Sequence, residues 1–248
     1  MRLNCDMGES FGLWAMGEDA QVMPWIDMAN IACGFHASDP QTMAKTVELA
    51  VRHGVQIGAH PGYEDKPGFG RRSIPHALPS ITQLLVYQVG ALDGICTLYD
   101  SHVSYVKPHG ALYNDMMARP EIFEAILKAI AALNQQRKEP LPLMILARSD
   151  NRAYSDLARD YQVSLLCEAF ADRAYSADGA LAPRGQTGSV YQDPQQIKRQ
   201  VVELAAGRVT SIEGQSLKLS ADTICVHGDN RASMEIISEL RGLMAKND

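Results

Sequence analysis

The sequence is poor in positive charge and has no long uninterrupted apolar run. Its 23 Lys and Arg residues are outnumbered by 29 Asp and Glu residues, giving a formal net charge of -6. No broad basic surface is therefore expected to attract nucleic acid or an anionic membrane. The first residues are polar and acidic, and no window approaches the roughly eighteen apolar residues that a membrane helix needs. We expect a soluble, cytoplasmic protein with no nucleic-acid or membrane partner.

Common nucleotide and cysteine motifs are also missing. The chain contains neither GxGxxG nor GxxxxGK followed by Ser or Thr, so neither of these common phosphate-binding loops is present to hold a nucleotide. The cysteines form no CxxC pair and four of them lie in apolar runs, which predicts buried, reduced thiols rather than ligands or disulfides. They are Cys5, Cys33, Cys96, Cys167 and Cys225. No linker or low-complexity segment interrupts the chain, which predicts a single domain over residues 1–248.

Seven short apolar runs alternate with segments of helical periodicity. The runs cover residues 3–5, 29–33, 55–59, 105–106, 141–147, 163–167 and 223–226. Helices are expected from Asp39-Pro40 to Gly54, from about 80, from about 120, near 151–161, at 194–206, and through Met234, Ile237, Leu240 and Met244. Such α/β repeats argue for a parallel sheet with helical crossovers, either a seven-stranded barrel or an open doubly wound sheet.

Chemistry-capable side chains follow nearly every apolar run. They are Asp6 and Glu9, His36, His60, Lys107 and His109, Glu168, Asp172 and Arg173, and His227 and Asp229. A barrel of parallel strands brings all strand carboxyl ends to one mouth, whereas an open sheet concentrates its chemistry at one switch point. The spread of these residues over the whole chain therefore favours the barrel, and indicates an enzyme. His53, His76 and His102 lie in loop or helix-end positions and are expected at the surface.

Two connections are too long and glycine-rich to serve only as links. Residues 61–79 and 172–193 both follow predicted strands, so both would hang over the mouth. The first carries Arg71 and Arg72, and the second carries Arg173 and Arg184. These arginines could bind a carboxylate or phosphate through paired hydrogen bonds, or could be solvated loop charges.

Six blocks of the chain together resemble a known family. They read NCDMGESFG from residue 4, NIACGFHA from 30, GAHPGY from 58 with GFGRR from 68, VKPHGALYN from 106, EAFADR from 168 and VHGD from 226. On these blocks the chain resembles the LamB/YcsF family. The family pattern usually has glycine where this chain has Ser38, and a Cβ there occupies space that glycine leaves open.

The resemblance implies a fold and an activity. The implied fold is an α/β structure, a seven-stranded parallel (β/α) barrel similar to the glycoside hydrolase/deacetylase superfamily, and in particular to polysaccharide deacetylases. The implied activity is that of one component of the bacterial 5-oxoprolinase, which works with subunits B and C. That enzyme opens 5-oxo-L-proline to L-glutamate at the expense of ATP.

The polar residues of the predicted mouth suit this chemistry. ATP-coupled amide hydrolysis needs an acid and a base near the carbon, donors for an oxyanion and cations for phosphates. The catalytic candidates are Asp6, Glu9, His60, Lys107 and His109, with Asp6 as base. Substrate- or phosphate-binding candidates are Asn4, His36, Arg71, Arg72, Asn114, Glu168, Arg173 and His227. ATP is the expected cofactor, held here or with partner subunits, and a divalent metal such as Mg²⁺ could bind Asp6, His60 and His109.

Two other functions fit the same residues. One is a metal-dependent deacetylase or amidohydrolase, with Asp6 as base and His60 and His109 holding a metal that activates water. The other is a non-catalytic regulatory component, which would have little use for so many titratable groups at strand ends. Asp6 and Glu9 could also simply cap the turn that follows the first strand.

Overall fold

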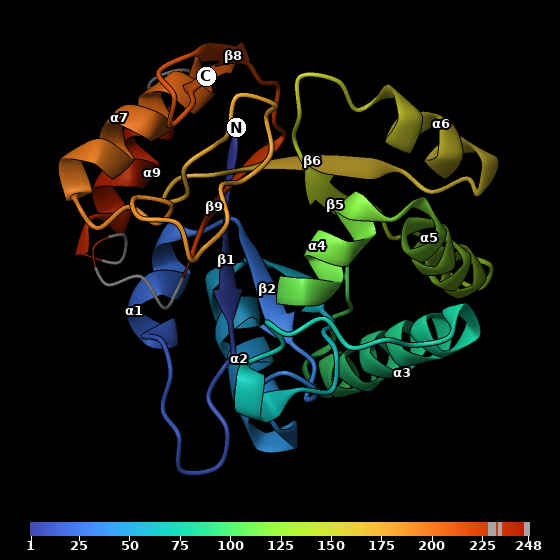
Figure 1. The fold of residues 1–248 in the computed structure, drawn as a ribbon. Coiled ribbons are helices and arrows are strands. Elements are labelled where there is room, and N and C mark those ends of the chain that lie inside the picture. Colours follow the sequence, from blue (N-terminus) through green and yellow to red (C-terminus); the bar gives the residue numbers. More distant parts are fainter. Residues whose placement is uncertain (228–231, 233–234, 246–248) are drawn as a thin grey trace.

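The seven apolar runs form one closed barrel of parallel strands (Figure 1). The computed structural model describes residues 1–227, 232 and 235–245. In ring order the strands are β1 (Arg2–Met7), β2 (Met28–Ala32), β3 (Gln56–His60), β4 (Tyr105–Val106), β5 (Leu143–Leu146), β6 (Leu165–Phe170) and β9 (Thr223–Val226). Pairing of β1 with β9 closes the ring. The barrel predicted from the sequence is therefore confirmed, and the open sheet is wrong.

The two faces of each strand have different chemistry. In β1, Leu3 and Cys5 join the main apolar core, while Asn4 and Asp6 point into the barrel. The inward-facing residues of β1 pair with inward-facing residues of β2, because the strand register places Asn4 opposite Met28 and Asp6 opposite Asn30. The floor of the barrel is a small apolar layer, and the polar groups lie above it toward the strand carboxyl ends. This layer contains Met28, Tyr105 and Met144, with Leu166 packed against it.

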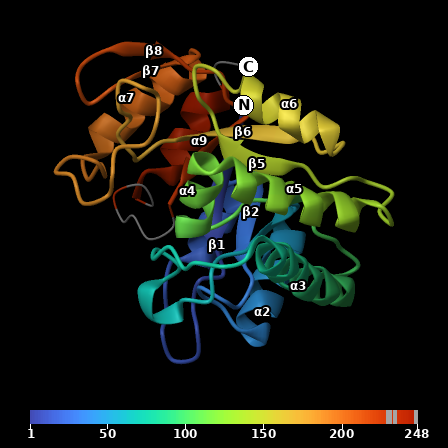
Figure 2. The same cartoon turned by 45° about the vertical axis from the view of Figure 1, so that its right-hand side comes forward.

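Helices cover the outside of the ring (Figures 1 and 2). They are α1 (Asp19–Val22), α2 (Pro40–His53), α3 (Leu78–Cys96), α4 (Gly110–Ala118), α5 (Pro120–Asn134), α6 (Arg152–Asp160), α7 (Pro194–Ala205) and α9 (Ile237–Ala245). Short 3-10 turns occur at η1 (Met23–Trp25), η2 (Lys66–Gly68) and η3 (Thr97–Tyr99). Of the last predicted helix, Met234 lies outside the described residues.

The ends of α2 follow from local signals. The Asp39 side chain accepts a hydrogen bond from the Thr42 amide at 2.9 Å, and Pro40 occupies the first turn, where an amide hydrogen is dispensable. Gly54 ends the helix with φ of 67°, the left-handed conformation that glycine adopts at little cost. These are the caps that the sequence predicts.

Some elements were not expected from the sequence. Helix α4 begins at Gly110, directly after His109, in a block that stands out in the sequence for its polar residues rather than for helical periodicity. A two-stranded antiparallel hairpin of β7 (Arg208–Thr210) and β8 (Ser216–Lys218) precedes the last barrel strand. Both are too short for a clear periodic pattern.

The long second connection is ordered by its own contacts. Bridges join Arg173 to Val190 and Tyr175 to Leu181, and the Tyr175 hydroxyl accepts a hydrogen bond from the Phe170 amide at 2.8 Å. The connection therefore holds a defined position beside the barrel mouth.

One stretch, Leu78–Tyr99, is long and apolar enough to cross a membrane by length and composition alone. Its residues Ile81, Leu85, Val89 and Leu92 are buried in the main core, and α3 packs against α5. The stretch is therefore apolar because it forms a core helix.

Candidate active site

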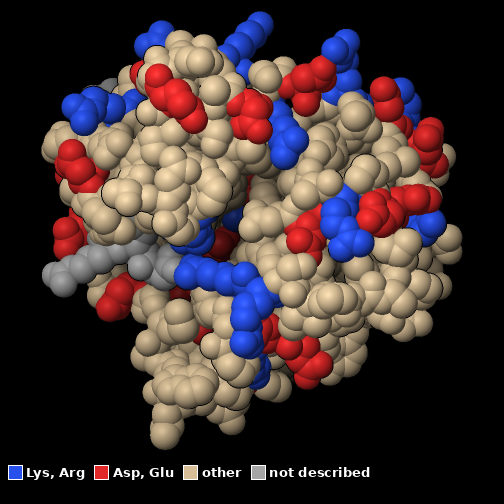
Figure 3. Space-filling view, viewed as in Figure 1, with Lys and Arg blue, Asp and Glu red and all other residues tan. Residues whose placement is uncertain are grey.

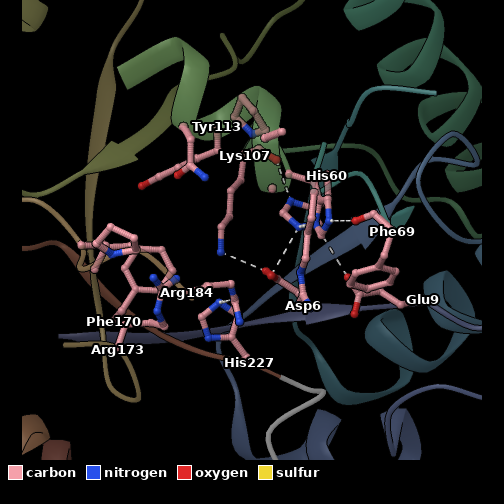
Figure 4. A pocket seen from close by; sticks show the side chains of 18 of the residues that line it. Asp6, Glu9, His60, Phe69, Lys107, Tyr113, Phe170, Arg173, Arg184 and His227 are labelled. Atoms are coloured by element: carbon pink, nitrogen blue, oxygen red, sulfur yellow. Dashed lines mark hydrogen bonds and ion pairs between the residues drawn. The ribbon is translucent and has the colours of Figure 1, made fainter. Parts of the chain in front are cut away.

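A cavity of about 590 Å³ opens at the carboxyl ends of the strands. Figure 3 shows blue Lys and Arg side chains beside the central hollow of this face, with acidic atoms visible inside it. The lining includes Asp6, Glu9, His60, Phe69, Arg71, Lys107, His109, Tyr113, Asn114, Phe170, Arg173, Arg184 and His227. The convergence predicted from strand ends is thus present (Figure 4).

A buried charge cluster lies at the base of the cavity, with Asp6 and Lys107 in the lining and Glu168 directly behind them. The Lys107 ammonium lies 2.9 Å from Asp6 Oδ1 and 3.0 Å from Glu168 Oε2, and all three side chains are nearly inaccessible. Burial opposes the charge on Lys107, but the nearby anionic groups, Asp6 foremost, outweigh it and hold the pKa of Lys107 well above the ordinary value. The ammonium is therefore charged at neutral pH, a strong positive point in a low-dielectric site.

Asp6 is ionised for the same reason. Burial alone would raise the pKa of its carboxyl, but His60 and Lys107 hold that pKa well below the ordinary value. For Glu168 burial prevails, so its pKa is raised although Lys107 opposes the shift. The cluster therefore combines one strongly acidic carboxyl with one that resists ionisation.

Two residues that sequence reasoning missed orient Asp6. Asn30 donates to Asp6 Oδ1 at 2.8 Å, and the Tyr105 hydroxyl donates to Asn30 Oδ1 at 2.7 Å. Asn30 also donates to Asn4 Oδ1 at 2.8 Å. The sequence did contain a signal for Asn30, because a polar side chain within an otherwise apolar buried strand needs a hydrogen-bond partner.

His60 and His109 meet on one side of the cavity. His60 Nδ1 lies 2.7 Å from the Lys107 carbonyl, and His109 Nε2 lies 2.8 Å from the Phe69 carbonyl. Since a carbonyl only accepts, both nitrogens carry hydrogen. The remaining nitrogens, His60 Nε2 and His109 Nδ1, face each other at 2.9 Å. Asp6 Oδ2 is 3.4 Å from His60 Nε2.

His227 and Arg184 form the opposite wall (Figure 4). His227 Nδ1 lies 2.7 Å from Asp172 Oδ1, so this nitrogen donates and His227 Nε2 accepts from Arg184 at 3.1 Å. The imidazole also stacks on the Phe170 ring. An arginine is thereby held over the cavity by a defined histidine tautomer.

Arg173 lines the cavity and also binds the second long connection, residues 172–193. Its guanidinium donates to the Ala182 carbonyl at 2.7 Å and to the Ser189 carbonyl at 3.3 Å. Burial, followed by the nearby Arg184, lowers the pKa of Arg173 to about 10, so it remains charged at neutral pH. Some of the Arg173 N–H groups are therefore already bonded to the backbone of this connection.

Other predicted site residues lie outside the cavity. Asn4, His36 and Glu168 are buried behind its lining. Arg72 is turned away and pairs with Asp65, whereas Arg71 lines the cavity with its guanidinium over the Phe69 ring. Asp229 lies outside the described residues.

The remaining histidines and the cysteines largely follow expectation. His53 and His102 are exposed, but His76 is half-buried and stacks on Tyr63. All five cysteines are free thiols, and only Cys167 is partly exposed.

Known proteins resemble this chain over nearly its whole length. Residues 1–248 match the LamB/YcsF family. A 5-oxoprolinase A subunit of Vibrio vulnificus is 56% identical over 245 residues, which cover 98% of this chain and 97% of the relative. The third 5-oxoprolinase A subunit of Pseudomonas aeruginosa is 52% identical over 243 residues, or 98% and 95% of the two chains.

A solved structure confirms the architecture. The crystal structure of "Lactam Utilization Protein" from Thermus thermophilus superposes with a TM-score of 0.89 at 35% sequence identity. The superposition covers 99% of this chain and 96% of the other.

Proposed function

Since the chain belongs to the LamB/YcsF family, we propose that it is the ring-opening component of an ATP-dependent 5-oxoprolinase. The reaction would be hydrolysis of the cyclic amide of 5-oxo-L-proline to L-glutamate, with ATP converted to ADP and phosphate. Support comes from relatives named as 5-oxoprolinase A subunits and from the structural relative named a lactam utilization protein. The whole chain would act as one catalytic domain in the cytoplasm.

The observation that carries this proposal is the Asp6–Lys107–Glu168 cluster at the floor of the cavity. Amide hydrolysis places negative charge on the carbonyl oxygen in its transition state, and a fixed ammonium stabilises that charge. Lys107 supplies this cation without a change of protonation, because its pKa is raised.

Asp6 is the proposed base. Its Oδ1 is engaged by Lys107 and Asn30, so Oδ2 is the oxygen available toward the cavity and His60. Its depressed pKa keeps it ionised over the neutral range, the form able to accept a proton from an attacking water.

The arginines of the mouth are proposed to hold anionic groups. Arg71, Arg173 and Arg184 line the same cavity, and 5-oxoproline carries a carboxylate that such groups bind. A phosphorylated lactam would meet the same cations, with phosphate as the leaving group. The sequence contains neither GxGxxG nor the phosphate-binding GxxxxGK motif. We therefore propose that ATP is used by the assembly with subunits B and C, with Mg²⁺ accompanying the nucleotide.

The test is glutamate release from 5-oxoproline by the chain reconstituted with subunits B and C. The assay is run with and without ATP, after chelation and after adding Mg²⁺ back. Dependence on ATP and on all three chains supports the proposal, and absence of turnover in every condition contradicts it.

A pair of arginine variants tests the proposed substrate contact. Arg184→Gln should raise the KM for 5-oxoproline because it removes a cation from the cavity wall. Arg208→Gln, at an exposed position on β7, should leave KM unchanged and serves as the control.

A metal-dependent amidohydrolase is the second candidate, favoured by the imidazoles of His36, His60 and His109 gathered beside the cavity. It predicts that the chain alone hydrolyses a simple N-acetyl amide when a divalent metal is present, without ATP. A chain that binds its partner subunits but neither lactam nor metal would instead be a regulatory component.

A further inference from the structure

We propose that Glu9, His36, His60 and His109 form a binding site for one divalent transition-metal ion of the zinc type. Each offers one ligand atom, and these four atoms all lie within 4.8 Å of one another. All four residues are buried at the carboxyl end of the barrel. This inference concerns the chain alone and does not depend on the lactam reaction.

The first argument comes from the two nitrogens that face each other. His60 and His109 each use one ring nitrogen to donate to a backbone carbonyl, so in the neutral rings both facing nitrogens present lone pairs. Two lone pairs at 2.9 Å repel unless a cation lies between or beside them. That cation is either a proton or a metal ion.

His36 favours the metal ion over the proton. Its side chain is essentially inaccessible, yet neither ring nitrogen has a hydrogen-bond partner within the described part of the chain. Burying an unpaired polar group costs free energy, and a proton shared by the other two rings would leave this cost in place. A metal bound to His36 would give one of these two nitrogens a partner.

Glu9 supplies the negative charge that such an ion needs. Its Oε1 lies 3.8 Å from His36 Nε2 and 3.8 Å from His109 Nδ1. Ligand atoms about 2.0–2.1 Å from one tetrahedral ion are roughly 3.4 Å apart, so the 3.8 Å distances to Glu9 are close to the spacing that ligands of one ion have.

Binding requires one rearrangement that the site permits. The His36 and His109 rings are parallel, with centroids 3.7 Å apart, so their lone pairs cannot both point at one ion until the His36 ring turns. Within the described residues, no hydrogen bond holds that ring in its present orientation. Glycine is needed at two positions for the His36 ring to fit here, since a Cβ at Gly62 would lie 2.8 Å from His36 Nδ1, and one at Gly70 would lie 2.7 Å from His36 Cβ.

The donor set indicates the class of metal. Three imidazoles and one carboxylate suit Zn²⁺ and its neighbours, whereas Mg²⁺ prefers oxygen ligands. The backbone carbonyls that accept from His60 and His109 orient the rings as second-layer partners do in metal sites. A bound ion would supply an activated water or a polarised carbonyl next to the cavity.

A second group of potential ligands is a poorer candidate. Asp6, Cys225 and His227 also offer atoms within 4.8 Å of one another. However, Lys107 Nζ lies 2.9 Å from Asp6 Oδ1 and 3.2 Å from Cys225 Sγ, so an ammonium already occupies this region and would repel a metal cation.

The experiment uses the purified full chain without substrate or partner subunits. After chelation, the protein is equilibrated with Zn²⁺, Mn²⁺ or Mg²⁺, and bound metal is counted by elemental analysis after dialysis. We expect one Zn²⁺ per chain, no retained Mg²⁺, and visible absorption bands on replacement by Co²⁺. Glu9→Gln and His36→Gln should each weaken Zn²⁺ binding by about 100-fold or more, because each removes a ligand.

The control is His102→Gln, which removes an exposed imidazole that lies beside Glu139 and is not one of the four proposed ligands. It should bind Zn²⁺ as the natural chain does, and circular dichroism without metal checks that every variant is folded. The proposal is overturned if the folded natural chain retains no Zn²⁺, or if folded Glu9→Gln and His36→Gln bind it with unchanged affinity. Because metal is counted without turnover, loss of the lactam reaction would not affect the result.

Discussion

Replacing Lys107 by methionine should destabilise the protein strongly and in a pH-dependent manner. The change removes the ammonium that lies 2.9 Å from Asp6 and 3.0 Å from Glu168 while keeping a side chain of similar length. It leaves two carboxyls without their shared cation in a site where Glu168 is fully buried. The variant should also lose turnover, because the proposed oxyanion cation is gone.

The size of the effect follows from the burial of the cluster. Removing one partner of a buried ion pair costs about 3–5 kcal/mol, since the remaining charge has no compensation. For a chain of this length each kcal/mol lowers the melting temperature by roughly 2–4 °C, so the expected fall is about 6–20 °C near neutral pH. An exposed pair provides the control: Lys128 lies 2.9 Å from Glu124, and Lys128→Met should leave the melting temperature unchanged within error.

The sign of the pH dependence is set by Glu168. Burial already raises its pKa, and loss of Lys107, which lowers that pKa, raises it further. The folded variant then binds a proton that the unfolded chain releases, so its stability falls as pH rises above the ordinary glutamate pKa of about 4.3. The deficit against the natural chain should therefore be smaller at about pH 5.5 than at about pH 8.

Thermal unfolding followed by circular dichroism at both pH values measures this difference. A Lys107→Met variant as stable as the natural chain at the higher pH would refute the account of the buried cluster. A deficit of equal size at both pH values would refute the role assigned to Glu168.

Three further predictions concern other parts of the chain. Asp6→Asn should reduce glutamate release by about 100-fold or more, because the amide cannot accept the proton. It should lower the melting temperature less than Lys107→Met does, because Glu168 remains beside the Lys107 ammonium; normal turnover would exclude Asp6 as base. Ser38 has a φ of 74°, so Ser38→Gly should raise stability by about 1 kcal/mol in denaturant unfolding, and a loss of stability would argue against strain there. Gly58→Ala should lower the free energy of unfolding by about 1–3 kcal/mol, since the new Cβ would lie 2.1 Å from the Tyr105 ring. Gly90→Ala, which has open space in α3, should not destabilise the protein and serves as the control in thermal unfolding.

The sequence predicted which residues meet at the barrel mouth where these residues follow strands directly. Asp6, His60, Lys107 and His109 were expected at one mouth, and all four line the cavity. The rule behind this is geometric, since parallel strands share one carboxyl end. Arg72 was expected there too, but pairs with Asp65 instead, because the course of a long loop is decided by tertiary contacts rather than by its position after a strand.

Local signals in the chain were enough to specify the alternation of seven strands with helices and the caps of α2, because apolar periodicity and capping residues act within a few neighbouring positions. The three-dimensional fold was needed to show that Asn30 and Tyr105 hold Asp6. It was also needed to show that His36 is buried against His109 with no hydrogen-bond partner among the described residues. The alternation of apolar and polar residues in the sequence indicates that successive strand side chains point to opposite faces. It does not indicate which side chains meet inside the ring. That depends on the register of strands separated by tens of residues, and register is set when the barrel closes and buries one face.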